Sequence, residues 1–285
     1  MKVLVTGVKG QLGFDVTREL NKRGHQAVGV DVDEMDITDE NKVLEVVCGE
    51  KPGAVIHCAA WTAVDKAESF ADKVYEVNAL GAKYIAEACK KIGAKMSFIS
   101  TDYVFDGSGD APHKTTDERR ALSVYGRTKI QGEDFVREVL DKFFIVRITW
   151  AFGVNGGNFV KTMLKLADSG KTELNVVNDQ IGSPTYTVDL ARLLVDMVES
   201  ERYGVYHATN EGFISCYDFA REIFSLAGKT VKVNPVTTEE YLKLVPQQAK
   251  RPLNSRLDKS DLVKNGFEPL PDWRDALARY LKEIA

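Results

Sequence analysis

The chain has 285 residues, which allows one large domain or two, and 44% hydrophobic with 28% charged residues is ordinary for a soluble globular protein. Its formal net charge is −4 and it has no long stripe of Lys and Arg, so we expect no nucleic-acid partner. We also expect no membrane partner and a cytoplasmic location, because no apolar run could span a bilayer and the N-terminus carries no export signal.

Short β-branched runs alternate with longer amphipathic stretches in the first half of the chain. This alternation predicts βαβ units around a parallel sheet. The runs are almost entirely apolar, as strands buried on both faces require. The predicted strands are residues 2–5, 26–30, 54–58, 95–99 and 143–147, and the predicted helices are residues 11–23, 39–48, 71–92 and 124–140.

After residue 150 the alternation of strands and helices becomes less regular. Helices are predicted at 158–169, 187–200, 216–227 and from 273 onward, with strands at 173–177 and 204–208. The sequence therefore predicts an α/β fold: a Rossmann-like doubly wound parallel sheet with a smaller mixed α/β substrate-binding lobe. We assign residues 1–152 plus about 178–205 to the dinucleotide-binding lobe, and about 153–177 plus 206–285 to the substrate lobe.

Gly7, Gly10 and Gly13 are spaced three apart, directly after the first strand and at the start of a helix. Glycines allow a tight turn and a close approach of the backbone to a pyrophosphate, and the helix N-terminus supplies N–H donors. Asp31 ends the second strand, where an acidic residue accepts the ribose hydroxyls of a dinucleotide. Although the spacing is a variant of Gly-x-Gly-x-x-Gly, this context favours a coenzyme site over a plain strand–helix junction.

The charges around Asp31 bear on which coenzyme is bound. A carboxylate there repels a 2′-phosphate, which favours NAD(H). Lys9, inside the turn, could reach such a phosphate, so NADP(H) stays open. Five further residues fall where the adenine and the far ribose would lie: Asp36, Ile37, Ala59, Ala60 and Trp61.

Tyr125 and Lys129 are four residues apart in a predicted helix, so their side chains share one face. Carbonyl reduction needs an acid that protonates the developing alkoxide. The pKa of an isolated tyrosine, about 10, is high for this work, but a neighbouring ammonium lowers it. We expect Tyr125 to be the acid, with Lys129 lowering its pKa and holding the nicotinamide ribose. Thr101 or Ser100, at the end of the fourth strand, would hydrogen-bond the substrate carbonyl oxygen.

Four longer strings accompany the glycine turn and the Tyr125–Lys129 pair. They are residues 61–68 (WTAVDKAE), 100–107 (STDYVFDG), 178–185 (NDQIGSPT) and 251–257 (RPLNSRL). With these strings the chain resembles the extended short-chain dehydrogenase/reductases and, among them, the dTDP-4-dehydrorhamnose reductase family. The resemblance covers essentially the whole chain. It implies the reduction of a dTDP-linked 4-keto-6-deoxy sugar by NAD(P)H, the final step of dTDP-L-rhamnose synthesis.

The resemblance also implies roles for single residues. Thr101, Tyr125 and Lys129 would be catalytic. Gly10, Gln11 and Leu12 would hold the pyrophosphate, and Asn78 would lie on the nicotinamide side. Thr62, Val64, Asp102 and Tyr103 would line the sugar together with Tyr125, and Trp150 would close over it. In the tail string, Arg251 and Arg256 carry guanidinium groups that suit the phosphates of a sugar nucleotide.

One departure from the family concerns metal. Some members use magnesium held by glutamates at a dimer contact. Here Asp15 follows the glycine turn, and no matching glutamate stands near residues 184–185, so we expect no metal. The four cysteines are scattered without metal-ligand spacing, which indicates reduced thiols. A homodimer remains open.

Two other functions are weighed against the reductase. One is a sugar-nucleotide epimerase or dehydratase of the same fold, but a dehydratase has Glu where Tyr103 stands here. The other is a non-catalytic NAD(P)-binding protein that resembles the regulatory subunit of methionine adenosyltransferase. By that resemblance the subunit has Ser-Asn-Tyr at the strand end, whereas this chain has Thr101-Asp102-Tyr103. Both comparisons favour the reductase.

Overall fold

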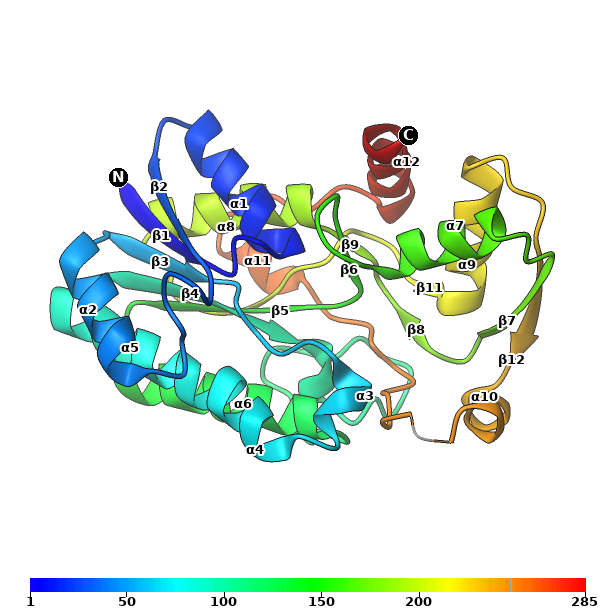
Figure 1. Ribbon diagram of the computed structural model, residues 1–285, viewed down its shortest axis with the longest axis horizontal. Coiled ribbons are helices and arrows are strands. Elements are labelled where there is room, and N and C mark those ends of the chain that lie inside the picture. Colours follow the sequence, from blue (N-terminus) through cyan, green and yellow to red (C-terminus); the bar gives the residue numbers. More distant parts are fainter. Residues whose placement is uncertain (247) are drawn as a thin grey trace.

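The computed structural model describes residues 1–246 and 248–285, and its centre is a six-stranded parallel sheet (Figure 1). The strands follow the order β10-β5-β4-β3-β1-β2. Their bounds are β1 Lys2–Thr6, β2 Gln26–Val30, β3 Ala54–His57, β4 Lys95–Thr101, β5 Phe143–Ile148 and β10 Gly204–His207. The chain runs from β1 outward to β2 and then returns to the other side of β1 at β3. Ligands of such sheets bind at the carboxyl ends of the strands around this change of direction.

Helices cover both faces of the sheet, which confirms the predicted doubly wound fold. α1 Gln11–Lys22 and α8 Thr187–Glu199 lie on one face, and α2 Glu40–Glu50, α5 Gly81–Ile92 and α6 Val124–Val139 lie on the other (Figure 1). Within β1, Val3 and Val5 pack under the first layer and Leu4 under the second. This alternation buries both faces, so the strand is apolar throughout. Among the described residues, no helix has the length and apolarity needed to cross a membrane.

The predicted helix at 71–92 is interrupted. It consists of α4 Ala71–Tyr75, a π-helical turn at Glu76–Leu80, and α5. The π turn contains Asn78, whose buried amide bonds the backbone of Trp61 in both directions, at 2.8 and 3.2 Å. A π turn of this kind shifts the register of a helix locally and is common near functional sites. Hydrophobic periodicity does not distinguish a single π turn from the α-helix around it, so it predicted one helix.

The rest of the chain forms a smaller mixed region. A parallel pair, β7 Glu173–Val177 with β12 Lys232–Val236, packs with helices around Phe152, Phe219, Trp273 and Tyr280. Its helices are α7 Phe159–Asp168, α9 Cys216–Leu226, α10 Thr238–Leu244 and α12 Trp273–Ile284. The remaining short elements are α3 Val64–Ala67, β6 Ala151–Phe152, β8 Ile181–Gly182, β9 Thr185–Tyr186, β11 Ile214–Ser215, α11 Ser260–Lys264 and a 3₁₀ turn at Asp102–Val104.

The division into two lobes remains a prediction. Two features of the structure concern where the boundary between the lobes falls. β10 pairs with β5 in the main sheet, so that sheet continues past residue 205. Leu262, Phe267 and Leu270 pack in the same core as α1 and α8. By packing, these parts of the C-terminal third adjoin the nucleotide side of the molecule.

Candidate active site

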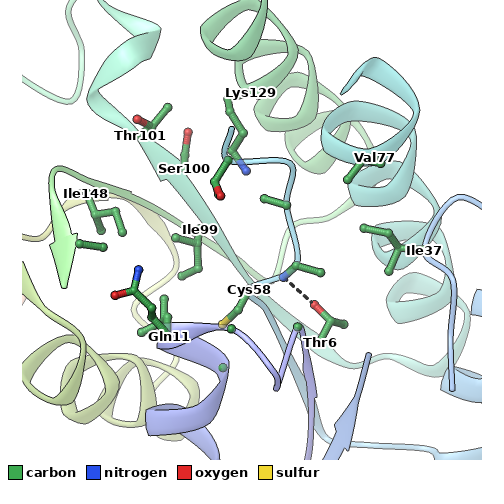
Figure 2. Close-up of a pocket in the computed structure, with 18 of the residues that line it drawn as sticks. Thr6, Gln11, Ile37, Cys58, Val77, Ile99, Ser100, Thr101, Lys129 and Ile148 are labelled. Carbon is green, nitrogen blue, oxygen red and sulfur yellow. Dashed lines mark hydrogen bonds between the residues drawn. The ribbon is translucent and has the colours of Figure 1, made fainter. Parts of the chain in front are cut away.

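A cavity of about 800 Å³ lies at the carboxyl ends of the parallel strands. Its size falls within the usual range of small-molecule sites. Eighteen of the residues predicted from the sequence line it: Gly7, Gly10, Gln11, Leu12, Gly13, Asp31, Asp36, Ile37, Ala59, Ala60, Thr62, Val64, Thr101, Asp102, Tyr103, Tyr125, Lys129 and Trp150. Figure 2 shows how side chains from several strand ends meet there, with Gln11 opposite Lys129.

Other residues of the lining were missed by the sequence analysis. They include Thr6, Val32, Met35, Cys58, Val77, Ile99, Ile148, Ala151, Gly157 and Thr187. Several of them occupy the last position of a predicted strand or follow it directly. That position was a usable signal, because the carboxyl ends of parallel strands share one edge of the sheet.

Four predicted site residues lie outside the lining. Trp61 and Asn78 bond each other, and Asn78 also donates to Thr128 Oγ1 at 3.2 Å, so this pair fixes the loop after β3 onto α6. Arg251 forms a two-pronged ion pair with Asp65, at 2.9 and 3.2 Å. Its charge still reaches Tyr103, where it opposes the rise that burial causes in the pKa of that phenol.

The placement of Arg256 corrects a prediction. Arg256 lines a separate depression beside Phe213 and Arg274 instead of the cavity. The reason is the direction of the tail. Ser255 turns inward and donates to Asp102 Oδ2 at 2.5 Å, and in extended chain the next side chain points to the opposite side. Ser255 was missed, because the string 251–257 shows no sign of which of its residues turns inward.

The glycine turn is built for close contact with a ligand. Gly7 has φ +69°, and a Cβ there would lie 2.8 Å from the backbone nitrogen of Ala59. A Cβ on Gly13 would lie 2.3 Å from the carbonyl oxygen of Gly7. α1 begins at Gln11, and its N-cap residue Gly10 has no side chain to cap it, so the first N–H groups of the helix are available to an anion. This cradle fits the pyrophosphate of a dinucleotide.

Asp31 and Lys9 stand together at the ribose end of the cavity. Asp31 accepts hydrogen bonds from the backbone N–H groups of Lys9 and Val32, each at 2.9 Å. The Lys9 ammonium pairs with Asp33, and both of these side chains are largely exposed. The carboxylate is therefore fixed by backbone, whereas the ammonium sits on a flexible side chain and can change partner.

α6 presents Tyr125 and Lys129 to the cavity. The helix starts here because Ser123 caps it, its Oγ accepting from the Gly126 N–H at 3.2 Å. Burial raises the pKa of Tyr125 to about 12 and lowers the pKa of Lys129 to about 7. The Lys129 ammonium lies 4.0 Å from the centre of the Phe98 ring, and Figure 2 shows its side chain reaching from the helix into the cavity.

Thr101 and Asp102 complete this wall. The Thr101 hydroxyl donates to Asp102 Oδ1 at 3.1 Å and accepts from the Tyr103 N–H at 3.2 Å. Burial raises the pKa of Asp102 to about 6, against the hydrogen bonds from Ser255 and Thr101. Ser100 instead donates to Glu133 at 2.6 Å, so of the two strand-end hydroxyls Thr101 is the better placed for a substrate oxygen.

Asp15, at the position weighed for a metal, is buried and accepts from Thr187 Oγ1 at 2.6 Å. Arg18 contacts its other oxygen at 3.4 Å. Over residues 1–246 and 248–285, no three His, Cys, Asp or Glu side chains are grouped as metal ligands. The expectation that no metal is used stays a prediction.

A doubly wound sheet, a glycine cradle and an adjoining Tyr–Lys pair together define an oxidoreductase of the extended short-chain dehydrogenase/reductase class. Residues 1–285 match the family model described as RmlD substrate binding domain. The chain belongs to the dTDP-4-dehydrorhamnose reductase family and is an NAD(P)-dependent enzyme, which confirms the resemblance seen in the sequence.

Three relatives show the extent of the similarity. Spore coat polysaccharide biosynthesis protein SpsK of Bacillus subtilis is 41% identical over 99% of this chain and 97% of its own. The dTDP-4-dehydrorhamnose reductase of Aggregatibacter actinomycetemcomitans is 40% identical, with 97% of each chain covered. The crystal structure of dTDP-4-dehydrorhamnose reductase from Bacillus anthracis in complex with NADP is 41% identical, covers 99% of both chains and has a TM-score of 0.95.

Proposed function

We propose that the protein reduces the 4-keto group of dTDP-4-dehydro-L-rhamnose with NAD(P)H and so forms dTDP-L-rhamnose. The observation that carries the proposal is the position of Tyr125 and Lys129 in one cavity with the glycine cradle and Thr101. The names of relatives about 40% identical over almost the whole chain support the choice of substrate. We place the reaction in the cytoplasm, and a homodimer stays a prediction.

The coenzyme would lie along the edge of the sheet from the cradle to α6. Gly7, Gly10 and Gly13 would receive the pyrophosphate, and Asp31 with Lys9 would face the adenosine ribose. When bound, the coenzyme supplies the hydride for the ketone carbon. Lys129 would hold the nicotinamide ribose from α6.

The protein's own contribution to the reaction is the transfer of a proton to the ketone oxygen. As negative charge develops on the ketone oxygen, Thr101 Oγ1 would donate a hydrogen bond to it and the Tyr125 hydroxyl would give up its proton. A phenol with a pKa of about 12 is a weak acid, so the reaction depends on a positive charge that stabilises the phenolate. Lys129, one helical turn away on the same face, supplies that charge.

The sugar would occupy the part of the cavity between Thr62, Val64, Tyr103 and Trp150. Trp150 has the left-handed backbone value φ +44°, which is unusual for a residue other than glycine. Its indole is wedged against Gly182, where an added Cβ would lie 3.1 Å from the ring. Backbone strain held in this way is frequent at ligand sites, and it supports a role for Trp150 in covering the sugar.

The alternatives are weaker on specific grounds. Tyr103 follows Asp102 on the cavity wall, where a dehydratase would need a carboxylic acid. The UDP-glucose 4-epimerase of Thermus thermophilus is 20% identical with a TM-score of 0.84, and this likeness concerns the fold alone. A non-catalytic regulatory subunit would not need an acid beside the coenzyme site. A measurement of turnover distinguishes such a subunit from an enzyme.

The decisive experiment mixes the protein with NADH or NADPH and dTDP-4-dehydro-L-rhamnose. We expect the absorbance of the reduced coenzyme to fall in proportion to dTDP-L-rhamnose formed, measured by chromatography. The free 4-keto sugar without its nucleotide serves as the control for substrate class. Absence of turnover with both coenzymes, in protein that binds them, would exclude the reductase and favour the regulatory subunit.

Coenzyme preference provides a second prediction. Asp31→Asn should raise KM for NADH by about 10-fold or more, since a hydrogen bond to a charged group is worth roughly 1.5–3 kcal/mol. Lys9→Ala should instead raise KM for NADPH and leave KM for NADH near its original value. Lys22→Ala, an exposed lysine at the far end of α1, is the control and should change neither KM. Equal effects of Lys9→Ala on both coenzymes would show that Lys9 does not discriminate between them.

A further inference from the structure

Glu133 lies outside the lining of the cavity, behind the lining residues Thr101 and Lys129. It follows Lys129 by four residues on α6, so the two side chains share a helix face. Its side chain is fully buried. One carboxylate oxygen accepts from Ser100 Oγ at 2.6 Å and from Arg147 Nε at 2.8 Å, and the other accepts from Arg147 Nη2 at 2.7 Å.

The partners of Glu133 come from the strands that form the active site. Ser100 on β4 and Arg147 on β5 are directly paired in the sheet, and their side chains meet on the same carboxylate. Thr101 is the next residue after Ser100. Through these bonds Glu133 joins the helix that carries Tyr125 and Lys129 to the strand end that carries Thr101.

The carboxylate is held in its ionised form. Burial opposes ionisation, but the hydrogen bonds and charge of Arg147, with further bonds from Ser100 and the charge of Arg119, keep the pKa of Glu133 below its ordinary value. Arg119 and Arg137 approach the same carboxylate at 3.2 and 3.5 Å. A buried carboxylate with this many donors is fixed in position as well as in charge.

Three other titratable groups around Lys129 are uncharged near neutral pH. At the end of β3, burial lowers the pKa of His57 to about 3, and directly after the strand it raises that of Cys58 to about 12. On α6 itself, Tyr125 is a neutral phenol with a pKa of about 12. The 3₁₀ turn after β4 contributes Asp102, which has a pKa of about 6 and is largely ionised at neutral pH, but its charge acts on Tyr125. β4 contributes the Phe98 ring. Of the two ionised carboxylates, Glu133 is therefore the one whose charge acts on Lys129.

We propose that Glu133 is a positioning residue of the reaction, which locks α6 to the ends of β4 and β5 and supplies the negative charge that keeps Lys129 protonated. The inference rests on the proposed function for its kinetic consequences. The proposed effect of the Glu133 charge on the protonation of Lys129 does not depend on which substrate the enzyme uses.

The test compares Glu133→Gln with Glu133→Asp and with Glu138→Gln, an exposed glutamate on the same helix. Loss of the charge at Glu133 should move the alkaline limb of the kcat/KM profile to lower pH by about one unit, because less protonated Lys129 remains. Glu133→Asp and Glu138→Gln should keep the limb in place. If the alkaline limb of Glu133→Gln coincided with that of the unaltered enzyme, the proposed effect of the Glu133 charge on Lys129 would be overturned.

A second readout needs no turnover. Competitive labelling of Lys129 with 1-fluoro-2,4-dinitrobenzene over a range of pH, read by mass spectrometry, reports the titration of its amine directly. We expect the labelling curve of Glu133→Gln to move to lower pH like the kinetic limb, and an unmoved curve would refute the proposal. Lack of turnover in the unaltered enzyme would reject the proposed function but leave this measurement decisive.

Ser100→Ala tests the positioning part by itself. Glu133→Gln removes the counter-ion of buried Arg147 and can impair folding, whereas Ser100→Ala leaves every charge in place. It should lower kcat by about 10-fold, with an unmoved pH limb and an unchanged KM for the coenzyme. Unaltered kcat in Ser100→Ala would overturn the positioning role.

Discussion

Replacing Tyr125 by phenylalanine should lower kcat by about 10²–10⁴-fold, the usual contribution of a positioned general acid. The phenyl ring left at this position would keep the edge-on packing that Tyr125 makes with Tyr103 at 5.5 Å, so the cavity wall should stay in place. Coenzyme affinity should change little, because the cradle and Asp31 lie at the other end of the site. Steady-state kinetics with the keto sugar and a coenzyme titration by fluorescence measure both quantities.

Tyr203→Phe is the matched control for this substitution. The Tyr203 ring packs on Phe144, and Tyr203 is not part of the cavity lining. Removing the Tyr203 hydroxyl should leave kcat near its original value. If Tyr125→Phe kept more than a small fraction of the turnover, another group would have to supply the proton.

Replacing Gly13 by alanine should weaken coenzyme binding by about tenfold or more and destabilise the fold. The new Cβ would lie 2.3, 2.7 and 2.9 Å from three backbone atoms of Gly7 and Val8, none of which can rotate away. Overpacking of this kind costs about 1–3 kcal/mol, and a distortion of the cradle worth about 1.4 kcal/mol weakens binding about tenfold. Thermal unfolding and a coenzyme Kd report the two effects.

Gly49→Ala is the control for the loss of a glycine as such. Gly49 lies in α2 with open space where its Cβ would be. Alanine there should stabilise the helix by up to about 1 kcal/mol and leave the coenzyme Kd unchanged. An unchanged Kd in Gly13→Ala would show that the turn is not the pyrophosphate site.

Sequence reasoning succeeded where function and local pattern coincide. The turn at Gly7–Gly13 lies at a strand–helix junction, and the pair Tyr125–Lys129 lies in the first turns of a helix; periodicity predicts both elements. Their meeting in one cavity follows from the topology of a parallel sheet, since strand ends converge there.

The predictions that failed have a common cause: hydrophobic periodicity does not indicate the direction in which these side chains point. Arg256 and Ser255 are adjacent in an irregular tail, and only the fold reveals that Ser255 turns toward Asp102. Glu133 was passed over because a glutamate on a helix is ordinarily solvated. Its burial depends on Arg147, which the chain brings beside it from another strand.

The bond between Ser255 and Asp102 has a consequence for the stage at which the enzyme becomes competent on the ribosome. These two residues are 153 positions apart, whereas the three glycines of the coenzyme cradle all lie within the first 13 residues. At a synthesis rate of about 5–20 residues per second, the tail emerges roughly 10–50 s after the cradle. The residues of the cradle are therefore synthesised long before the residue that braces Asp102. Because α1 also packs in one core with Leu262, Phe267 and Leu270, both parts of the site become complete only when the chain is almost finished.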